Sequence, residues 1–137
     1  MTTQTLEQKR AKHALDQIKE LKQDRAGNYV SYVNALPAAI LMNGLGQALA
    51  TERAASDKAH HKLVNHVSKW LLSNEAHTKY ANSAAAEDSK LDDAQRLLNR
   101  IVAGDQDAYL WAQAEAIAYV TWLKKLASAF LESSEKE

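Results

Sequence analysis

The apolar residues of this chain are strongly biased towards helix-forming types. Alanine and leucine dominate the apolar set, whereas valine and isoleucine together number ten and phenylalanine occurs once. Alanine and leucine favour helices, while β-branched and aromatic residues favour strands. The sequence therefore predicts an all-α fold without a sheet, a compact bundle of five to seven helices around a single core.

Length and cysteine content narrow the class of protein further. The chain has 137 residues, the size of one domain, so we expect residues 1–137 to form a single helical domain. Folding at this size buries about two-thirds of the extended chain's surface, so stability requires no metal or disulfide. The absence of cysteine excludes a disulfide framework, a thiolate nucleophile and cysteine-ligated zinc or iron–sulfur sites.

The N-terminus and the spread of apolar residues bear on localisation. The opening residues MTTQTL contain no apolar stretch, and no window of about 18 uninterrupted apolar residues occurs anywhere. We therefore expect no secretion signal, no membrane span and a cytoplasmic protein.

Apolar residues at helical spacing place the helices. Pro37 is expected to begin one of them, because proline suits the first turn of a helix and disfavours helical backbone in the residue before it. The nearly continuous small and apolar run over 38–50 is expected to be the buried centre. The expected helices span residues 5–25, 29–35, 37–55, 57–72, 89–103 and 105–131, with an alanine-rich polar loop over 73–88 and a frayed tail over 132–137.

Residue types suited to catalysis or metal binding occur without the spacing that such sites need. Three histidines lie on the expected fourth helix: His60, His61 and His66. Two zinc ligands on one helix need i, i+3 or i, i+4 spacing, which no pair of these has. Three carboxylate pairs lie near expected helix starts, where they cap free N–H groups: Glu87-Asp88, Asp92-Asp93 and Asp105-x-Asp107. We expect a protein that is not an enzyme and has neither a metal site nor a cofactor.

A stripe of basic residues on the expected fourth helix is a candidate binding surface. Lys58, Lys62 and Lys69, with Asn65 between them, follow one face of that helix away from its apolar face, and no acidic residue interrupts them. The stripe is about 16 Å long at the rise of an α-helix. A solvated face more often interleaves glutamate with lysine, whereas a row of lysines suits the phosphates of a nucleic-acid backbone. Spacing alone leaves both interpretations open.

Residues on the first and last expected helices are further candidates. Arg10 lies at the edge of an apolar stripe, where its guanidinium can reach a phosphate or a buried carboxylate. Trp111 and Trp122 share a side of the last helix that lies about 100° or more from its main core side. They are either an exposed contact surface for a partner or covered by a neighbouring helix. Lys124 and Lys125 follow immediately.

Several segments resemble a known family. The run YVSYVNALPAAILMNGLGQ at residues 29–47 resembles the signature of the small helical subunit of the CRISPR type III-B effector, the Cmr complex. Arg10-Ala11, Trp70-Leu71 and the helix from Tyr109 to Lys125 fit the same family. The loop over 73–88 shows no correspondence.

The resemblance implies a non-catalytic subunit of an antiviral ribonucleoprotein. Such subunits stack in several copies, line the channel that holds the duplex of crRNA and target RNA, and contact RNA without reading its sequence. The implied partners are the large subunit, the backbone subunits, further copies of the chain, crRNA and target RNA. The residues that we expect to contact RNA are Lys58, Lys62, Lys69, Arg10, Lys124 and Lys125. The alternative is a helical adaptor that binds only proteins, through Trp111 and Trp122.

The distribution of charge agrees with a stacking subunit. The zero net charge argues against a nucleic-acid-binding protein, but residues 1–70 carry ten basic and six acidic residues, a net charge of +4, and residues 71–137 carry seven and eleven, a net charge of −4. A basic surface on one copy can therefore meet an acidic surface on the next.

Overall fold

The computed structural model describes residues 3–24, 27–81 and 90–131. Within these ranges the chain is all-helical, with six α-helices, one short 3-10 helix and no strand. The elements are α1 (Leu6–Asp24), α2 (Tyr29–Asn43), α3 (Leu45–Ala54), α4 (Lys58–Leu72), η1 (Asn74–Ala76), α5 (Asp93–Ala103) and α6 (Gln106–Phe130). The expectation of an all-α bundle is confirmed.

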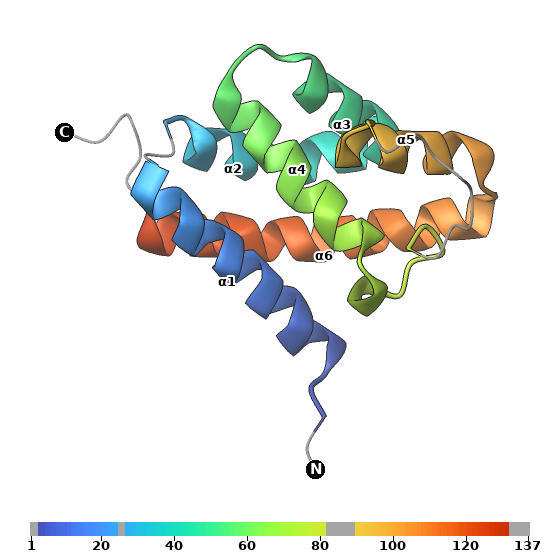
Figure 1. The fold of residues 1–137 in the computed structure, drawn as a ribbon, viewed down its shortest axis with the longest axis horizontal. Helices are drawn as coiled ribbons and strands as arrows, with labels where there is room; N and C mark the ends of the chain where they lie inside the picture. The colour runs from blue at the N-terminus through green and yellow to red at the C-terminus, as the bar shows by residue number, and fades with distance from the viewer. Residues whose placement is uncertain (1–2, 25–26, 82–89, 132–137) are drawn as a thin grey trace.

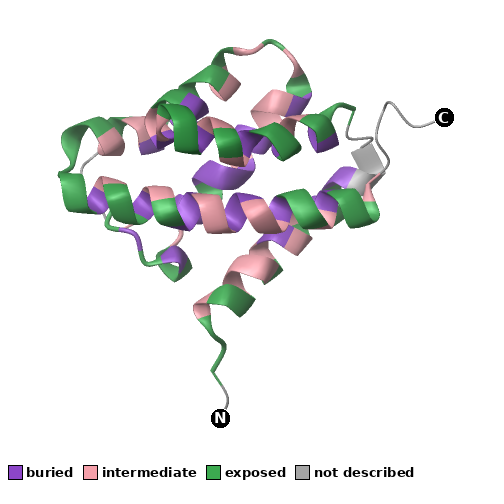
Figure 2. Ribbon diagram, turned by 180° about the vertical axis from the view of Figure 1, so that it is seen from behind, coloured by how far each residue is buried: buried purple, intermediate pink, exposed green. Residues whose placement is uncertain are grey.

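Helices α6 and α4 organise the bundle. The α6 helix runs along the longest dimension of the molecule, and α1 crosses it obliquely (Figure 1). The α4 helix contacts each of the other five described α-helices. Buried residues line the sides of the helices that face one another (Figure 2), so they form one continuous core around α4.

The sequence of α4 explains its central place. Its N-cap is Asp57, whose side chain accepts a hydrogen bond of 2.8 Å from the backbone N–H of Ala59. The apolar residues predicted for its inner face are all buried: Leu63, Val64, Val67, Trp70 and Leu71. One apolar face is thus enough to anchor α4 at the centre.

The boundary between the second and third helices differs from the prediction. The α2 helix continues through Pro37, and the break lies at Gly44, whose φ is +89°. Proline inside a helix removes one hydrogen bond, whereas a φ of +89° is accessible mainly to glycine. The predicted helix start at Pro37 is therefore wrong, and so is the placement of Gly44 inside a helix.

The prediction that the run over 38–50 forms the buried centre is wrong in part. Ile40, Leu45 and Leu49 are fully buried, but the side chains of Leu41 and Met42 are 68% and 82% exposed. The reason is that the buried residues of α2 recur at helical spacing along one side of the helix, which does not include Leu41 and Met42. The apolar residues on the outer face of α2 therefore remain in contact with solvent.

Side chains from α6 cap the first turn of α3. The Oε1 atom of Gln113 accepts from the N–H of Leu45 at 2.9 Å, and the hydroxyl of Tyr109 accepts from the N–H of Gly46 at 3.0 Å. These contacts satisfy backbone donors that a helix start leaves free. They also fix the Gly44 break against α6.

Carboxylates cap the last two helices, as predicted. Asp92 and Gln95 form a reciprocal capping box at the start of α5, and Asp105 accepts from the N–H of Ala108 at the start of α6. The helix expected from residue 89 begins at Asp93. Glu87-Asp88, much of the expected loop and the expected tail over 132–137 lie outside the described residues.

Candidate functional site

The predicted basic stripe lies on the outer side of α4. Lys58 and Lys69 are exposed and Lys62 is half-buried, while the apolar residues of the same helix face the core. The α4 helix crosses in front of α2 in the view of Figure 1. The structure therefore places the three lysines along one side of a single helix, as the helical spacing predicts.

The same helix also carries a buried, neutral histidine. His66 is buried, and its Nδ1 atom lies 2.7 Å from the hydroxyl oxygen of Tyr29. Burial, together with the positive charges of Lys69 and Lys62, lowers the pKa of His66 to about 3. The His66 side chain is therefore neutral at neutral pH.

The other two histidines of α4 also contact neighbouring groups. His60 stacks on the ring of Tyr32, with centroids 3.5 Å apart, and its Nδ1 atom pairs with the Glu52 carboxylate. The Nε2 atom of His61 lies against the carbonyl oxygen of Ala55. In the described part of the chain no group of three or more potential ligands is arranged to hold a metal ion.

A buried polar cluster joins α1, α4 and α6. The Arg10 guanidinium donates to both carboxylate oxygens of Glu115, at 2.6 and 2.7 Å, and the indole N–H of Trp70 donates to the same carboxylate at 2.8 Å. The Arg10 side chain is 15% exposed and that of Glu115 is 4% exposed. The hydrogen bond with Glu115 raises the pKa of Arg10. Of the two partners expected for Arg10, the structure supplies the buried carboxylate.

An aromatic pair extends this cluster. The Nδ1 atom of His13 lies 2.6 Å from the hydroxyl oxygen of Tyr119, and the Tyr119 ring stacks on Trp70 with centroids 5.5 Å apart. Burial lowers the pKa of His13 and raises the pKa of Tyr119. Sequence reasoning missed Glu115, although a glutamate among the apolar residues of the last helix is a signal of a buried charged partner.

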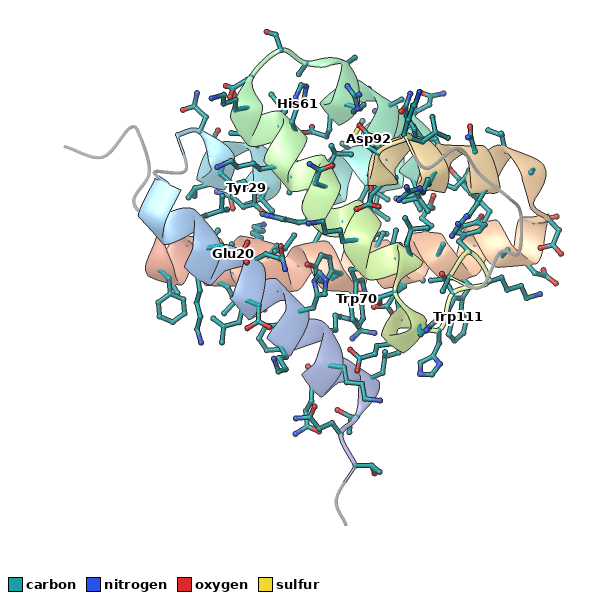
Figure 3. All side chains as sticks on the ribbon, in the orientation of Figure 1. Glu20, Tyr29, His61, Trp70, Asp92 and Trp111 are labelled. Atoms are coloured by element: carbon teal, nitrogen blue, oxygen red, sulfur yellow. The ribbon has the colours of Figure 1, made fainter. Side chains whose placement is uncertain are left out.

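The two tryptophans of α6 have different surroundings. Trp111 is 54% exposed, beside the similarly exposed Leu110, and it lies away from the crossing of α1 where Trp70 is buried (Figure 3). Trp122 is half-buried. Trp111 is therefore exposed and Trp122 is partly covered, and the contact of either with a partner stays a prediction.

Trp122 borders a surface hollow between α1 and α6. The volume of the hollow is about 300 Å³, and its lining residues are Glu7, Arg10, Ala118, Thr121, Trp122 and Lys125. Lys124 is exposed on α6 but does not line the hollow. Three residues singled out in the sequence, Arg10, Trp122 and Lys125, thus meet at one place, although two helices distant in the chain supply them.

Comparison with known proteins identifies the family. The family model described as "CRISPR-associated protein (Cas_Cmr5)" matches residues 6–130. The chain belongs to the Cmr5 family. This confirms the resemblance to the small subunit of the type III-B Cmr effector.

Two relatives illustrate the membership. The Cmr5 subunit of the CRISPR Cmr system of Thermotoga maritima is 27% identical over 139 residues, which cover 100% of this chain and 93% of that protein. The crystal structure of a CRISPR-associated Cmr5 family protein from Thermus thermophilus has the same fold, with a TM-score of 0.76 and 24% identity over 95% of this chain and 100% of that one. No described helix of this Cmr5-family chain is long and apolar enough to cross a membrane.

Proposed function

We propose that this Cmr5-family chain is a non-catalytic subunit that stacks in several copies within a type III-B CRISPR ribonucleoprotein. The copies line the channel for the duplex of crRNA and target RNA and contact the RNA backbone without reading its sequence. The complex acts in antiviral defence. The observation that carries the RNA contact is the lysine stripe along the outer side of α4.

The dimensions of the stripe suit a nucleic-acid strand. Lys58 and Lys69 are separated by three turns of α4, a length of about 16 Å. Phosphates of one strand follow one another at intervals of a few ångströms, so the stripe extends over several of them. Lysine binds phosphate as a point charge and reads no base edge. A contact of this kind holds RNA of any sequence.

The structural contacts of the acidic side chains support a non-catalytic role. Asp92 and Asp105 cap helices, and Glu115 accepts hydrogen bonds from Arg10 and Trp70. Each of these side chains has a structural partner. None of the three is therefore a free general base or a ligand of an open metal site.

The ends of α6 support stacking of copies. Asp105 and Asp107 are exposed at its N-terminal end, and Lys124 and Lys125 are exposed near its C-terminal end. Because α6 extends along the longest dimension (Figure 1), the aspartate pair and the lysine pair lie far apart at opposite ends of this helix. One copy can thus present an acidic end to the basic end of the next.

Binding measurements on the assembled complex test the RNA contact. In complexes reconstituted with the variant Lys58→Ala/Lys62→Ala/Lys69→Ala, we expect weaker retention of target RNA, by a similar factor for unrelated sequences. The matched control is Lys19→Ala/Lys79→Ala/Lys90→Ala, which removes three exposed lysines outside the stripe. Equal retention by the two triple variants contradicts the proposed contact.

The exposure of Trp111 favours a second candidate function, that of an adaptor which binds only proteins. Trp111 and Leu110 together form an exposed apolar surface, and aromatic side chains anchor many protein interfaces. If this candidate is correct, Trp111→Ala releases the chain from the complex while the triple lysine variant leaves RNA retention unchanged.

A further inference from the structure

The hollow between α1 and α6 combines an aromatic wall with charges of both signs. Trp122 and Ala118 supply apolar surface, Lys125 a cation and Glu7 a carboxylate. We propose that this hollow binds one unpaired nucleotide of an RNA strand, with its base against Trp122 and its phosphate on Lys125. The inference rests on the proposed RNA contact and assigns it a second place, away from the lysine stripe of α4.

The position of Trp122 suits a stacked base. Its side chain is half-buried and forms part of the lining, so it is held by the fold while a surface remains accessible. Bases stack on aromatic side chains in single-stranded complexes, and this contact tolerates any base because every base has a π-face. A base inside a duplex is already stacked, so the hollow selects an unpaired one.

Lys125 is placed to bind the phosphate of the same nucleotide. Trp122 and Lys125 are three residues apart on α6, a spacing that puts their side chains on neighbouring positions of the helix surface. Lys125 is exposed, so its ammonium group can reach a phosphate at the mouth of the hollow. Glu7, on the α1 side, can accept a hydrogen bond from an N–H group at the edge of a base.

The remaining wall is fixed before any ligand binds. Arg10 is held by Glu115 through two hydrogen bonds, and Thr121 donates to the carbonyl oxygen of Ile117 at 2.8 Å. Because the Arg10 charge is paired with a buried carboxylate, the charges left to meet a ligand are those of Lys125 and Glu7. A pre-formed site loses less entropy on binding than one that must be ordered.

Fluorescence of the full-length chain tests the stacking contact. In a Trp111→Phe background, Trp122 is the tryptophan that borders solvent, since Trp70 is fully buried. We expect a short oligouridylate to quench this fluorescence saturably at low salt. The variant Trp122→Leu keeps an apolar side chain between α1 and α6, and it should lose the quenching and weaken binding roughly tenfold or more.

A lysine outside the hollow provides the matched control. Lys125→Ala should raise the Kd of the oligouridylate several-fold, whereas Lys79→Ala, which removes an exposed lysine outside the hollow, should change it little. Circular dichroism of each variant verifies that the helices are retained. If Lys79→Ala and Lys125→Ala have the same effect, the hollow is not the site.

The arms of the experiment separate this inference from the proposed function. One outcome is that the triple lysine variant of α4 weakens binding while Trp122→Leu and Lys125→Ala leave it unchanged. That result overturns the nucleotide site in the hollow and leaves the proposed function intact. If the oligouridylate does not bind the wild-type chain, the proposed nucleotide site in the hollow is wrong. Retention of RNA by the assembled complex tests the proposed function separately. If uridine monophosphate binds as tightly as the oligouridylate, the ligand is a free nucleotide and the RNA assignment is wrong.

Discussion

The guanidinium of Arg10 on α1 and the carboxylate of Glu115 on α6 form a bidentate ion pair inside the bundle, with N···O distances of 2.6 and 2.7 Å. The two residues are 105 positions apart in the chain. Trp70 on α4 donates a third hydrogen bond to the same carboxylate. One acidic side chain therefore ties three helices together and also fixes one wall of the hollow that Trp122 borders.

Removing this carboxylate should destabilise the fold strongly. Glu115→Ala leaves the Arg10 charge and the Trp70 N–H without their partner, and loss of one member of a buried ion pair costs about 3–5 kcal/mol. We expect a loss of this size in the free energy of unfolding measured in urea. The control is Lys12→Ala, which breaks an exposed pair with Asp16 and should cost less than about 1 kcal/mol.

The double variant Arg10→Ala/Glu115→Ala measures the interaction energy between the two side chains. Because the two groups interact directly, its cost should be clearly smaller than the sum of the two single variants. Simple additivity would show that Arg10 and Glu115 contribute independently and that the pair does not join α1 to α6.

The stability of the chain should fall in acid because of His66. Its folded pKa, about 3, is depressed below the ordinary 6.5, so the unfolded chain binds a proton that the folded chain does not. The stabilisation is present above about pH 6.5 and is lost as pH falls toward 3, at up to about 1.4 kcal/mol per pH unit. Urea unfolding at several pH values measures this slope.

The variant His66→Gln tests whether His66 causes the dependence of stability on pH. Glutamine does not titrate and can hydrogen-bond to the Tyr29 hydroxyl. It should therefore reduce the slope of unfolding free energy against pH by the equivalent of about one bound proton. His13, whose pKa is also lowered by burial, should account for part of the slope that remains. An unchanged slope in His66→Gln would falsify the assignment.

Much of the fold and of the lysine stripe follows from local sequence, whereas the hollow does not. Caps such as Asp57 and Asp105 and the single-sided placement of Lys58 and Lys69 depend on the geometry of one helix, which residue spacing predicts. The pairing of Arg10 with Glu115 depends on which helices meet, and no spacing within one segment contains that information. The break at Gly44 was missed because the α6 side chains that cap α3 are also distant in the chain.

Two glycines with positive φ should respond differently to alanine. Gly44 has φ +89° and ψ 156°, a region open almost only to glycine, and an added Cβ would lie 3.0 Å from the Tyr109 hydroxyl oxygen. Gly27 has φ +62° and no atom within 4 Å of an added Cβ. We expect Gly44→Ala to cost about 2–3 kcal/mol and Gly27→Ala about 1 kcal/mol, measured by urea unfolding. Equal costs would show that neither the backbone conformation of Gly44 nor the nearby Tyr109 hydroxyl disfavours a side chain at that position.

The salt dependence of RNA retention is the sharpest test of whether the α4 lysines contact RNA phosphates. If Lys58, Lys62 and Lys69 each contact a phosphate, the slope of log K against log salt concentration for target RNA should become shallower by about 2 in the complex that carries the triple alanine variant. The control triple variant at Lys19, Lys79 and Lys90 should keep the wild-type slope. A wild-type slope in the α4 variant would show that these lysines do not contact phosphates.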